Sequence, residues 1–242
     1  MDKNDTGLVF LENLNEAVRL NQWIYDYIEP HLGRSVLEVG CGIGNITEFL
    51  LREPTRKVFG VDVEPEYVQH VRQKFAANEG FQALAGDITD PSLVRQLPAG
   101  QFDSVVCLNV LEHIEDDALA VRVSHELLSP GGRLILLCPA HKALYGSMDR
   151  HLGHFRRYSR AGLAQLVTRE GFAVDRAFYF NSFSAPGWFV NGKLLNRRHA
   201  SPFQIRVVEF IVPLFRLFED RVKLPFGLSV LMFARKQPIA GP

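Results

Sequence analysis

Glycine stands at every second position of a loop that follows a short apolar run, and this pattern limits the folds open to the chain. Residues 36–44 read Val-Leu-Glu-Val-Gly-Cys-Gly-Ile-Gly. Glycine lacks a side chain and tolerates unusual dihedrals, so a ligand can approach the main chain, and we expect bare amides at 40–44. Open α/β sheets bind ligands at this place, beyond the carboxyl end of a strand. The pattern predicts a doubly wound α/β protein with a ligand at this loop.

The glycine spacing differs from that of dinucleotide-binding loops. Those loops read G-x-G-x-x-G/A, and their third small residue packs the helix against the strand. Gly40 and Gly42 fit this pattern, but Asn45 takes the third place and Gly44 comes one residue earlier. The loop therefore reads E-x-G-x-G-x-G, which argues against a dehydrogenase. A glycine loop alone is weak evidence, and the residues at fixed distances beyond it decide its meaning.

Apolar runs alternate with helical patterns after this loop. The alternation predicts a mostly parallel sheet with helices on both faces. Ser159 is placed to cap a further helix that ends before Gly171. The expected strands are near 35–40, 57–62, 81–85, 103–107, 132–138, 172–181 and 227–235, and the expected helices are near 44–53, 65–77, 91–97 and 115–128.

Polar residues end several of these strands, and their order resembles the class I methyltransferases that use S-adenosylmethionine. The E-x-G-x-G-x-G loop resembles the first motif of that family. Asp62 lies about 20 residues beyond the loop, where an acid accepts hydrogen bonds from ribose hydroxyls. The resemblance implies a single Rossmann-like domain over 1–242, with about seven strands, the last of them antiparallel. It also implies an enzyme that converts S-adenosylmethionine to S-adenosylhomocysteine.

The resemblance places cofactor contacts at the carboxyl ends of four strands in the core, residues 35–138. Asp87 would meet the adenine amine and Ile88 the adenine ring. Alternatives remain open: Asp62 can cap a helix, Glu38 can lie behind the glycine loop, and His113 can be a base, a cofactor contact or a structural donor. The complete expected set is Glu38, Gly40, Cys41, Gly42, Gly44, Asp62, Val63, Asp87, Ile88, Asn109, Val110 and His113.

Residues 139–158 form an insertion after the fifth strand that is rich in histidine, arginine and tyrosine. Loops at this edge of an α/β sheet carry specificity. The insertion resembles a bacterial methyltransferase subgroup with a D-x-x-x-x-H-x-R-R-Y pattern. The alternative is a structural loop in which Arg156 or Arg157 pairs with an acid. The residues expected to bind substrate are Tyr145, Asp149, Arg156, Arg157 and Tyr158.

Histidines near this edge are candidates for catalysis. An imidazole titrates near neutral pH, so His154, His151 or His113 can remove a proton from the acceptor. Asp149 joins His151 and His154 as a possible metal ligand by residue type. Their spacing matches no familiar metal site, and we expect no metal.

Two helical segments flank this core. Residues 1–34 have a helical period and would form an N-terminal cap, and residues 183–224 would form a second helical cap. In the second cap Pro213 should kink or split the helix. Seven Lys or Arg against three acids allow a membrane-surface contact or a dimer seam, although we favour packing over the active site. The residues that share one helical face are Phe203, Val207, Phe210, Ile211, Leu214 and Phe218.

Composition and net charge limit the kinds of partner and the cell compartment that we expect for the chain. A formal net charge of zero does not favour nucleic acid. An odd number of cysteines, no signal-like start and no run of ~20 apolar residues suggest the reducing cytoplasm. We expect a monomer or homodimer that methylates O, N or C of a small molecule, in bacterial secondary or cell-envelope metabolism. Alternatives are a lipid-linked or glycan acceptor at a membrane surface, with peripheral membrane contact, and a non-catalytic nucleotide-binding protein.

Overall fold

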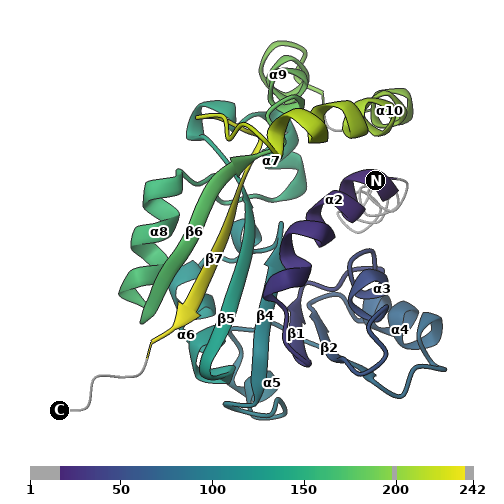
Figure 1. Ribbon diagram of the computed structural model, residues 1–242, viewed down its shortest axis with the longest axis vertical. Coiled ribbons are helices and arrows are strands. Elements are labelled where there is room, and N and C mark those ends of the chain that lie inside the picture. The colour runs from purple at the N-terminus through teal and green to yellow at the C-terminus, as the bar shows by residue number, and fades with distance from the viewer. Residues whose placement is uncertain (1–16, 198–200, 238–242) are drawn as a thin grey trace.

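The centre of the molecule is a seven-stranded sheet in the order β3-β2-β1-β4-β5-β7-β6 (Figure 1). The computed structural model describes residues 17–197 and 201–237. β7 pairs antiparallel with both β5 and β6, so the expected antiparallel last strand is confirmed. The strands are β1 (Ser35–Val39), β2 (Lys57–Asp62), β3 (Phe81–Ala85), β4 (Phe102–Leu108), β5 (Leu128–Pro139), β6 (Phe172–Phe180) and β7 (Ser229–Lys236).

Helices cover both faces of this sheet, as the alternating sequence pattern predicts. The α-helices are α2 (Val18–Ile28), α3 (Thr47–Leu50), α4 (Pro65–Lys74), α5 (Pro91–Val94), α6 (Asp117–Leu127), α7 (Ser147–Leu152), α8 (Arg160–Arg169), α9 (Ser184–Phe189) and α10 (Pro202–Glu219). Short helical turns are η1 (Glu29–His31), η2 (Leu111–His113), η3 (Lys142–Leu144) and the π-helical η4 (Val190–Leu194).

Successive strand residues enter two different cores because strand side chains alternate between faces. Leu37 and Val105 pack with residues of α5, α6 and α8. Their neighbours Val36 and Val106 pack with residues of α2 and α3. Strands buried on both faces read as continuous apolar runs, which explains the runs in the sequence.

Most of the predicted elements are present, and the differences have local causes. α3 is shorter than the expected 44–53 because the glycine loop continues past Gly44. Ser159 caps α8 as predicted, since its hydroxyl accepts from the Gly162 amide at 3.0 Å. α10 continues through Pro213, so of the two expected effects, a kink or a split, the split does not occur. Its inner side is held by Val212, which is buried in the core beside α2.

The segments that contain the candidate functional residues all follow the carboxyl ends of strands, so they lie at one end of the sheet, which we call the ligand edge. Phe180 at the end of β6 is in register with Ser229, which pairs with Pro139 at the end of β5. The segments after these two ends therefore start side by side, and α7, α9 and α10 gather at the top of the view in Figure 1. The glycine loop follows β1 at the same edge, because β1 and β5 both run parallel to β4.

The N-terminal cap packs as a helix against this edge. Trp23 and Ile28 of α2 are completely buried, and the Trp23 ring lies 4.5 Å from that of Phe180. Glu209 of α10 accepts from the first amides of α2, those of Arg19 and Leu20, at 2.8 and 3.0 Å. Residues 1–16 of the predicted cap lie outside the described residues.

The outer face of α10 departs from the sequence expectation. The apolar face that we expected to pack over the active site is instead exposed at Phe203, Phe210 and Leu214, which are 75%, 79% and 69% accessible. The packed side carries Val208 and Val212. Both sides of this helix are apolar, so the sequence period alone could not tell which one faces the protein.

Candidate active site

The glycine loop is shaped by positions that no other residue fits. Gly40 has φ +74°, and a Cβ there would come within 2.2 Å of Val110 Cγ2. Gly44 has φ +87°, and a Cβ there would meet the Phe75 ring at 2.7 Å. Positive φ already disfavours an L side chain. The loop therefore keeps a close main-chain approach between the ends of β1 and β4, where a ligand can touch the backbone.

Most amides of this loop already donate hydrogen bonds within the protein, so fewer of them can bind a ligand than the sequence suggests. Gly40 and Cys41 both donate to the Val61 carbonyl, at 2.7 and 3.1 Å, and Gly44 donates to the Cys41 carbonyl at 2.9 Å. Gly42 donates to Asp62 Oδ2 at 2.8 Å. The expectation of bare amides is wrong at these four positions, because the loop folds back onto the end of β2. A ligand at this loop would therefore be held by the shape of the loop and by side chains.

The sequence allowed two interpretations of Asp62, a contact with ribose hydroxyls and a helix cap. Its Oδ2 holds the Gly42 amide, and its Oδ1 accepts from the Glu64 amide at 3.0 Å. The N-cap residue of α4 is Glu64, so the alternative in which Asp62 caps this helix is wrong. A carboxylate offers about four acceptor positions, and these bonds use two of them. Burial raises the pKa of Asp62, while the bonds from Glu64 and Gly42 oppose the shift. Asp62 thus joins the glycine loop to β2 and keeps capacity for ribose hydroxyls.

Glu38 lies behind the loop, on the side of the sheet that carries α3. It is buried, and its Oε2 accepts from the Thr47 hydroxyl at 2.6 Å. Burial raises the pKa of Glu38 to about 8, and the Thr47 hydrogen bond opposes the shift. This geometry matches the alternative in which Glu38 supports the loop from behind, with Thr47 as its partner. A cofactor contact by Glu38 stays a prediction.

The remaining expected cofactor residues surround the same edge. Asp87 is exposed after β3, and its Oδ1 accepts from the Thr89 amide and hydroxyl at 2.8 and 2.7 Å. Ile88 is buried in the core with α5, and Val63 is 60% exposed beyond β2. Cys41 is buried against Val68 of α4, consistent with a small filler in the loop. Contacts of these residues with a ligand stay predictions.

The end of β4 connects the glycine loop to the segment 139–158. Asn109 has φ +56° and turns the chain after the strand. Val110 fills the space above Gly40, and η2 comes directly after it. The carbonyl of Glu112 then accepts from the Phe155 amide at 2.8 Å. One short turn therefore contacts both the cofactor loop and the candidate substrate segment.

Two of the three catalytic candidates lie together at this turn. The rings of His113 and His154 are 4.6 Å apart in an edge-to-face arrangement. The burial of one side of His113 lowers its pKa to about 4, and the neighbouring His154 acts in the same direction. Glu112, His113 and His154 have ligand atoms within 4.8 Å of one another, and we name them the Glu-His-His cluster. His151 lies on α7 and is not among these three residues.

Asp149 organises the segment 139–158 from inside. Its buried carboxylate accepts from Arg157 Nε at 2.6 Å, from the Gly146 amide at 2.9 Å and from Trp188 Nε1 at 3.3 Å. It also lies 3.0 Å from Nδ1 of His154. The pKa of Asp149 falls to about 2, because hydrogen bonds and the Arg157 charge outweigh the opposing effect of burial. We name these residues the Asp149 network.

Arg156 and Arg157 both pair with acids, as the structural alternative predicted. Arg157 binds Asp149 in the interior, while Arg156 contacts Asp117 at 2.8 Å nearer the surface. Tyr158 is buried and donates to Asp117 at 2.9 Å. The Tyr145 hydroxyl donates to the His154 carbonyl at 2.8 Å. These side chains hold the segment against η2 and α6, and their direct contact with substrate stays a prediction.

Sequence reasoning missed the partners that come from distant segments. Trp188 of α9 donates to Asp149, and the Arg157 guanidinium lies 4.9 Å from its ring centre. Thr47 holds Glu38, and Asp117 holds both Arg156 and Tyr158. None of these residues stands in a motif, and only their position in the fold reveals them.

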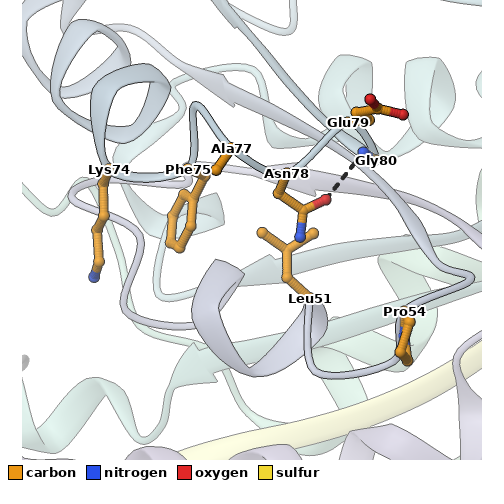
Figure 2. Close-up of a pocket in the computed structure, with 8 residues that line it drawn as sticks. All are labelled: Leu51, Pro54, Lys74, Phe75, Ala77, Asn78, Glu79 and Gly80. Atoms are coloured by element: carbon orange, nitrogen blue, oxygen red, sulfur yellow. Dashed lines mark hydrogen bonds between the residues drawn. The ribbon is translucent and has the colours of Figure 1, made fainter.

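A separate surface pocket lies at the opposite edge of the sheet. Leu51, Lys74 and Phe75 line this pocket with the turn before β3. In that turn the Gly80 amide donates to Asn78 Oδ1 at 2.9 Å, and Leu51 lies below Asn78 in Figure 2. Residues that line this pocket come directly before β2 and β3 in the sequence. The pocket is therefore at the amino ends of these strands, away from the glycine loop. Ligands of doubly wound sheets bind beyond the carboxyl ends, and we assign no function to this pocket.

The fold and its glycine-loop edge define a class of nucleotide-binding α/β domains, and comparison with known proteins narrows that class. A methyltransferase-domain family model matches residues 37–134. The chain therefore carries a class I S-adenosylmethionine-dependent methyltransferase domain, and S-adenosylmethionine is the cofactor of this family. The matched stretch contains the glycine loop, Asp62 and η2.

Curated relatives match over less than two thirds of the chain. The chain is 36% identical over 106 residues to a ubiquinone biosynthesis O-methyltransferase from Pseudomonas paraeruginosa, which covers 43% of this chain and 44% of the relative. It is 32% identical over 146 residues to a Mycolicibacterium smegmatis protein named as an S-adenosylmethionine-dependent methyltransferase, covering 59% and 53%. The chain thus spans about half the length of the curated relatives it matches.

Solved structures extend the likeness of fold to nearly the whole chain. A methyltransferase from Archaeoglobus fulgidus matches with a TM-score of 0.60 at 18% identity, covering 90% of this chain and 93% of that one. The cyclase SpnF matches with a TM-score of 0.60 at 17% identity, covering 91% and 81%. At such identities the likeness shows the fold alone, and the reaction must be argued from the site.

Proposed function

We propose that this protein transfers the methyl group of S-adenosylmethionine to an oxygen of a small-molecule acceptor. The observation that carries the proposal is one continuous set of contacts: Asp62 holds Gly42, Gly40 packs on Val110, and Glu112 joins η2 to the segment 139–158. The expected cofactor residues and the expected acceptor segment thus lie on either side of a single turn. The O-methyltransferase relatives favour oxygen over nitrogen or carbon.

The chain's own residues would position the reactants and take up a proton. When bound, S-adenosylmethionine supplies a methyl group already activated on a sulfonium. Orientation at near-attack distance contributes several kcal/mol in such reactions. A hydroxyl acceptor also has to lose its proton, and the Glu-His-His cluster would assist that loss. The Asp149 network would hold His154 in place.

Calorimetric titration with S-adenosylmethionine, followed by an assay for S-adenosylhomocysteine in the presence of phenolic acceptors, tests this function. We expect binding and acceptor-dependent formation of S-adenosylhomocysteine. Binding without turnover over a broad acceptor set would favour the non-catalytic alternative. Absence of binding would contradict the proposal altogether.

A second candidate places the acceptor at a membrane surface, where a lipid-linked or glycan substrate would be presented. No helix in the part of the chain that the structure describes is both long and apolar enough to span a bilayer. The favouring observation is the exposed stripe of α10, whose spacing alternates between three and four residues. Its members are Phe203, Val207, Phe210, Leu214 and Leu217, all at least 42% exposed. A stripe this apolar on a surface helix suits the headgroup boundary of a bilayer.

Charges around the stripe favour an anionic bilayer as the partner. The acids Glu209 and Glu219 are bound internally, by the first amides of α2 and by the amides at 181 and 182. Asp220 accepts from Trp23 and Tyr27. The basic residues Lys193 and Arg206 have no ion pair among the described residues. The segment thus offers uncompensated positive charge beside exposed apolar side chains.

Vesicle flotation tests this second candidate. We expect the protein to float with vesicles of phosphatidylglycerol and phosphatidylcholine, and the double substitution Phe203→Ser and Phe210→Ser to abolish flotation. Val63→Ser removes an exposed apolar residue elsewhere and serves as the control. Equal recovery of all three proteins with vesicles would contradict membrane docking, as would a stable dimer in gel filtration that the double substitution dissociates.

A further inference from the structure

A buried carboxylate and two imidazoles converge at the substrate edge from two separate segments. Glu112 and His113 follow β4, while His154 comes from the insertion after β5, and their ligand atoms lie within 4.8 Å of one another. We propose that the Glu-His-His cluster is a binding site for one divalent transition-metal ion. The arrangement joins groups that the sequence keeps far apart.

The tautomer of His154 is set by Asp149. His154 Nδ1 lies 3.0 Å from Asp149 Oδ1, and the same oxygen accepts from Arg157 Nε at 2.6 Å. A carboxylate that also receives a guanidinium is an acceptor, so Nδ1 carries the hydrogen and donates it. The lone pair is then on Nε2, which is the atom nearer Glu112. Carboxylates orient metal-binding imidazoles in this way and raise their basicity.

Glu112 supplies the second, independent observation. Its side chain is 1% exposed, and its Oε2 has no hydrogen-bond partner among the described residues. Its Oε1 lies 4.0 Å from His154 Nε2, which is too long for a hydrogen bond. Leaving a buried polar group without a partner is destabilising. A cation between the carboxylate and the imidazole would remove this destabilisation.

The ligand set selects the kind of ion. Imidazole suits zinc, copper, iron and nickel, whereas sites for magnesium and calcium are built from oxygen. Ligand atoms bound at about 2.1 Å lie roughly 3–3.5 Å apart, so the cluster must close by about 1 Å around an ion. His113 is exposed and can make this movement. Three protein ligands leave an open position on the ion toward solvent.

The use of this ion in catalysis rests on the proposed methyl transfer. A metal ion lowers the pKa of a bound O–H group, so an acceptor hydroxyl in the open position ionises more readily. With the ion bound, the O–H bond would break and the proton would pass to solvent water instead of to an imidazole. The oxygen's electron pair would then form the bond to the methyl carbon as the methyl–sulfur bond breaks and S-adenosylhomocysteine leaves. The site would therefore select acceptors whose hydroxyl can coordinate a metal.

Titration of metal-stripped protein with Co²⁺, followed by the visible absorption of the bound ion, tests the site. We expect one Co²⁺ per chain, displaced by Zn²⁺. Glu112→Gln and His154→Asn should each weaken Co²⁺ binding at least 100-fold. His70→Asn removes an exposed histidine of α4 and should bind Co²⁺ as the wild type does.

Circular dichroism and S-adenosylmethionine titration of the same samples separate this inference from the proposed function. Folded wild-type protein that binds neither Co²⁺ nor Zn²⁺ would overturn the metal site, as would wild-type Co²⁺ affinity in Glu112→Gln. Either result leaves the proposed function standing if S-adenosylmethionine still binds. Co²⁺ binding without S-adenosylmethionine binding would overturn the proposed function and keep the metal site.

Discussion

The two halves of the ligand edge are built by different physical means. The cofactor half, residues 35–138, is shaped by main-chain geometry: glycines at positive φ, a carboxylate on a loop amide and strands with fixed register. The acceptor half, residues 139–224, is held by buried polar side chains, with Asp149 at their centre. The first depends on local sequence, and the second depends on partners brought together by the fold.

This difference accounts for what the sequence could predict. Every strand was foreseen, because alternating apolar runs and glycine loops are local signals, whereas the direction of β7 was implied only by the family resemblance. Asp62 at the end of β2 was foreseen for the same reason. The Glu-His-His cluster was not, since Glu112 and His154 come from different connections and share no spacing rule. The expectation of no metal rested on Asp149, His151 and His154 alone.

The helix face of α10 shows the limit of periodicity. Phe210 and Val212 are both apolar, yet one is 79% exposed and the other 1%. A hydrophobic period identifies a face only when the opposite side is polar. A charge count has the same limit, because it includes Glu219, which is buried against the amides at 181 and 182. The sequence alone does not show which charged side chains are bound by partners inside the protein.

Gly40→Ala should produce the largest effect on the cofactor half. Its Cβ would lie 2.2 Å from Val110, and φ is +74°. We expect loss of at least 100-fold in S-adenosylmethionine affinity and a stability loss of about 3 kcal/mol from overpacking and backbone strain. Calorimetry and urea unfolding measure both quantities.

Gly131→Ala is the matched control for that substitution. Gly131 also has positive φ, +76°, but a Cβ there has nothing within 4 Å. It should lose only about 1 kcal/mol and bind the cofactor normally. Equal losses for the two substitutions would show that strain, and not the close approach to Val110, controls Gly40.

Arg157→Met should produce the largest loss of stability in the acceptor half. It leaves the buried Asp149 without its ion-pair partner, which costs about 3–5 kcal/mol in comparable buried pairs. Arg156→Met breaks a partly exposed pair with Asp117 and should cost about 1 kcal/mol or less. Urea unfolding of both variants compares them. A larger loss for Arg156→Met would refute the division between a buried and a surface arginine.

Glu38 should make stability depend on pH. Its folded pKa of about 8 lies above the ordinary value of 4.5, so the folded state binds more protons and stability falls as pH rises between these values. The fall attributable to Glu38 is on the order of 3 kcal/mol. Glu38→Gln should flatten it, while Glu48→Gln on the exposed side of α3 should not. Urea unfolding at pH 5, 6, 7 and 8 measures the slope, and a wild-type slope in Glu38→Gln would contradict the buried-acid account.

Cofactor binding by Asp62 and the glycine loop is the claim on which both halves depend. Calorimetric titration of S-adenosylhomocysteine into the wild type and into Asp62→Ala tests it most directly. A one-to-one complex in the wild type, with affinity at least tenfold weaker in folded Asp62→Ala, is the predicted result. Equal affinity in the two proteins, or no heat of binding in the wild type, would contradict it.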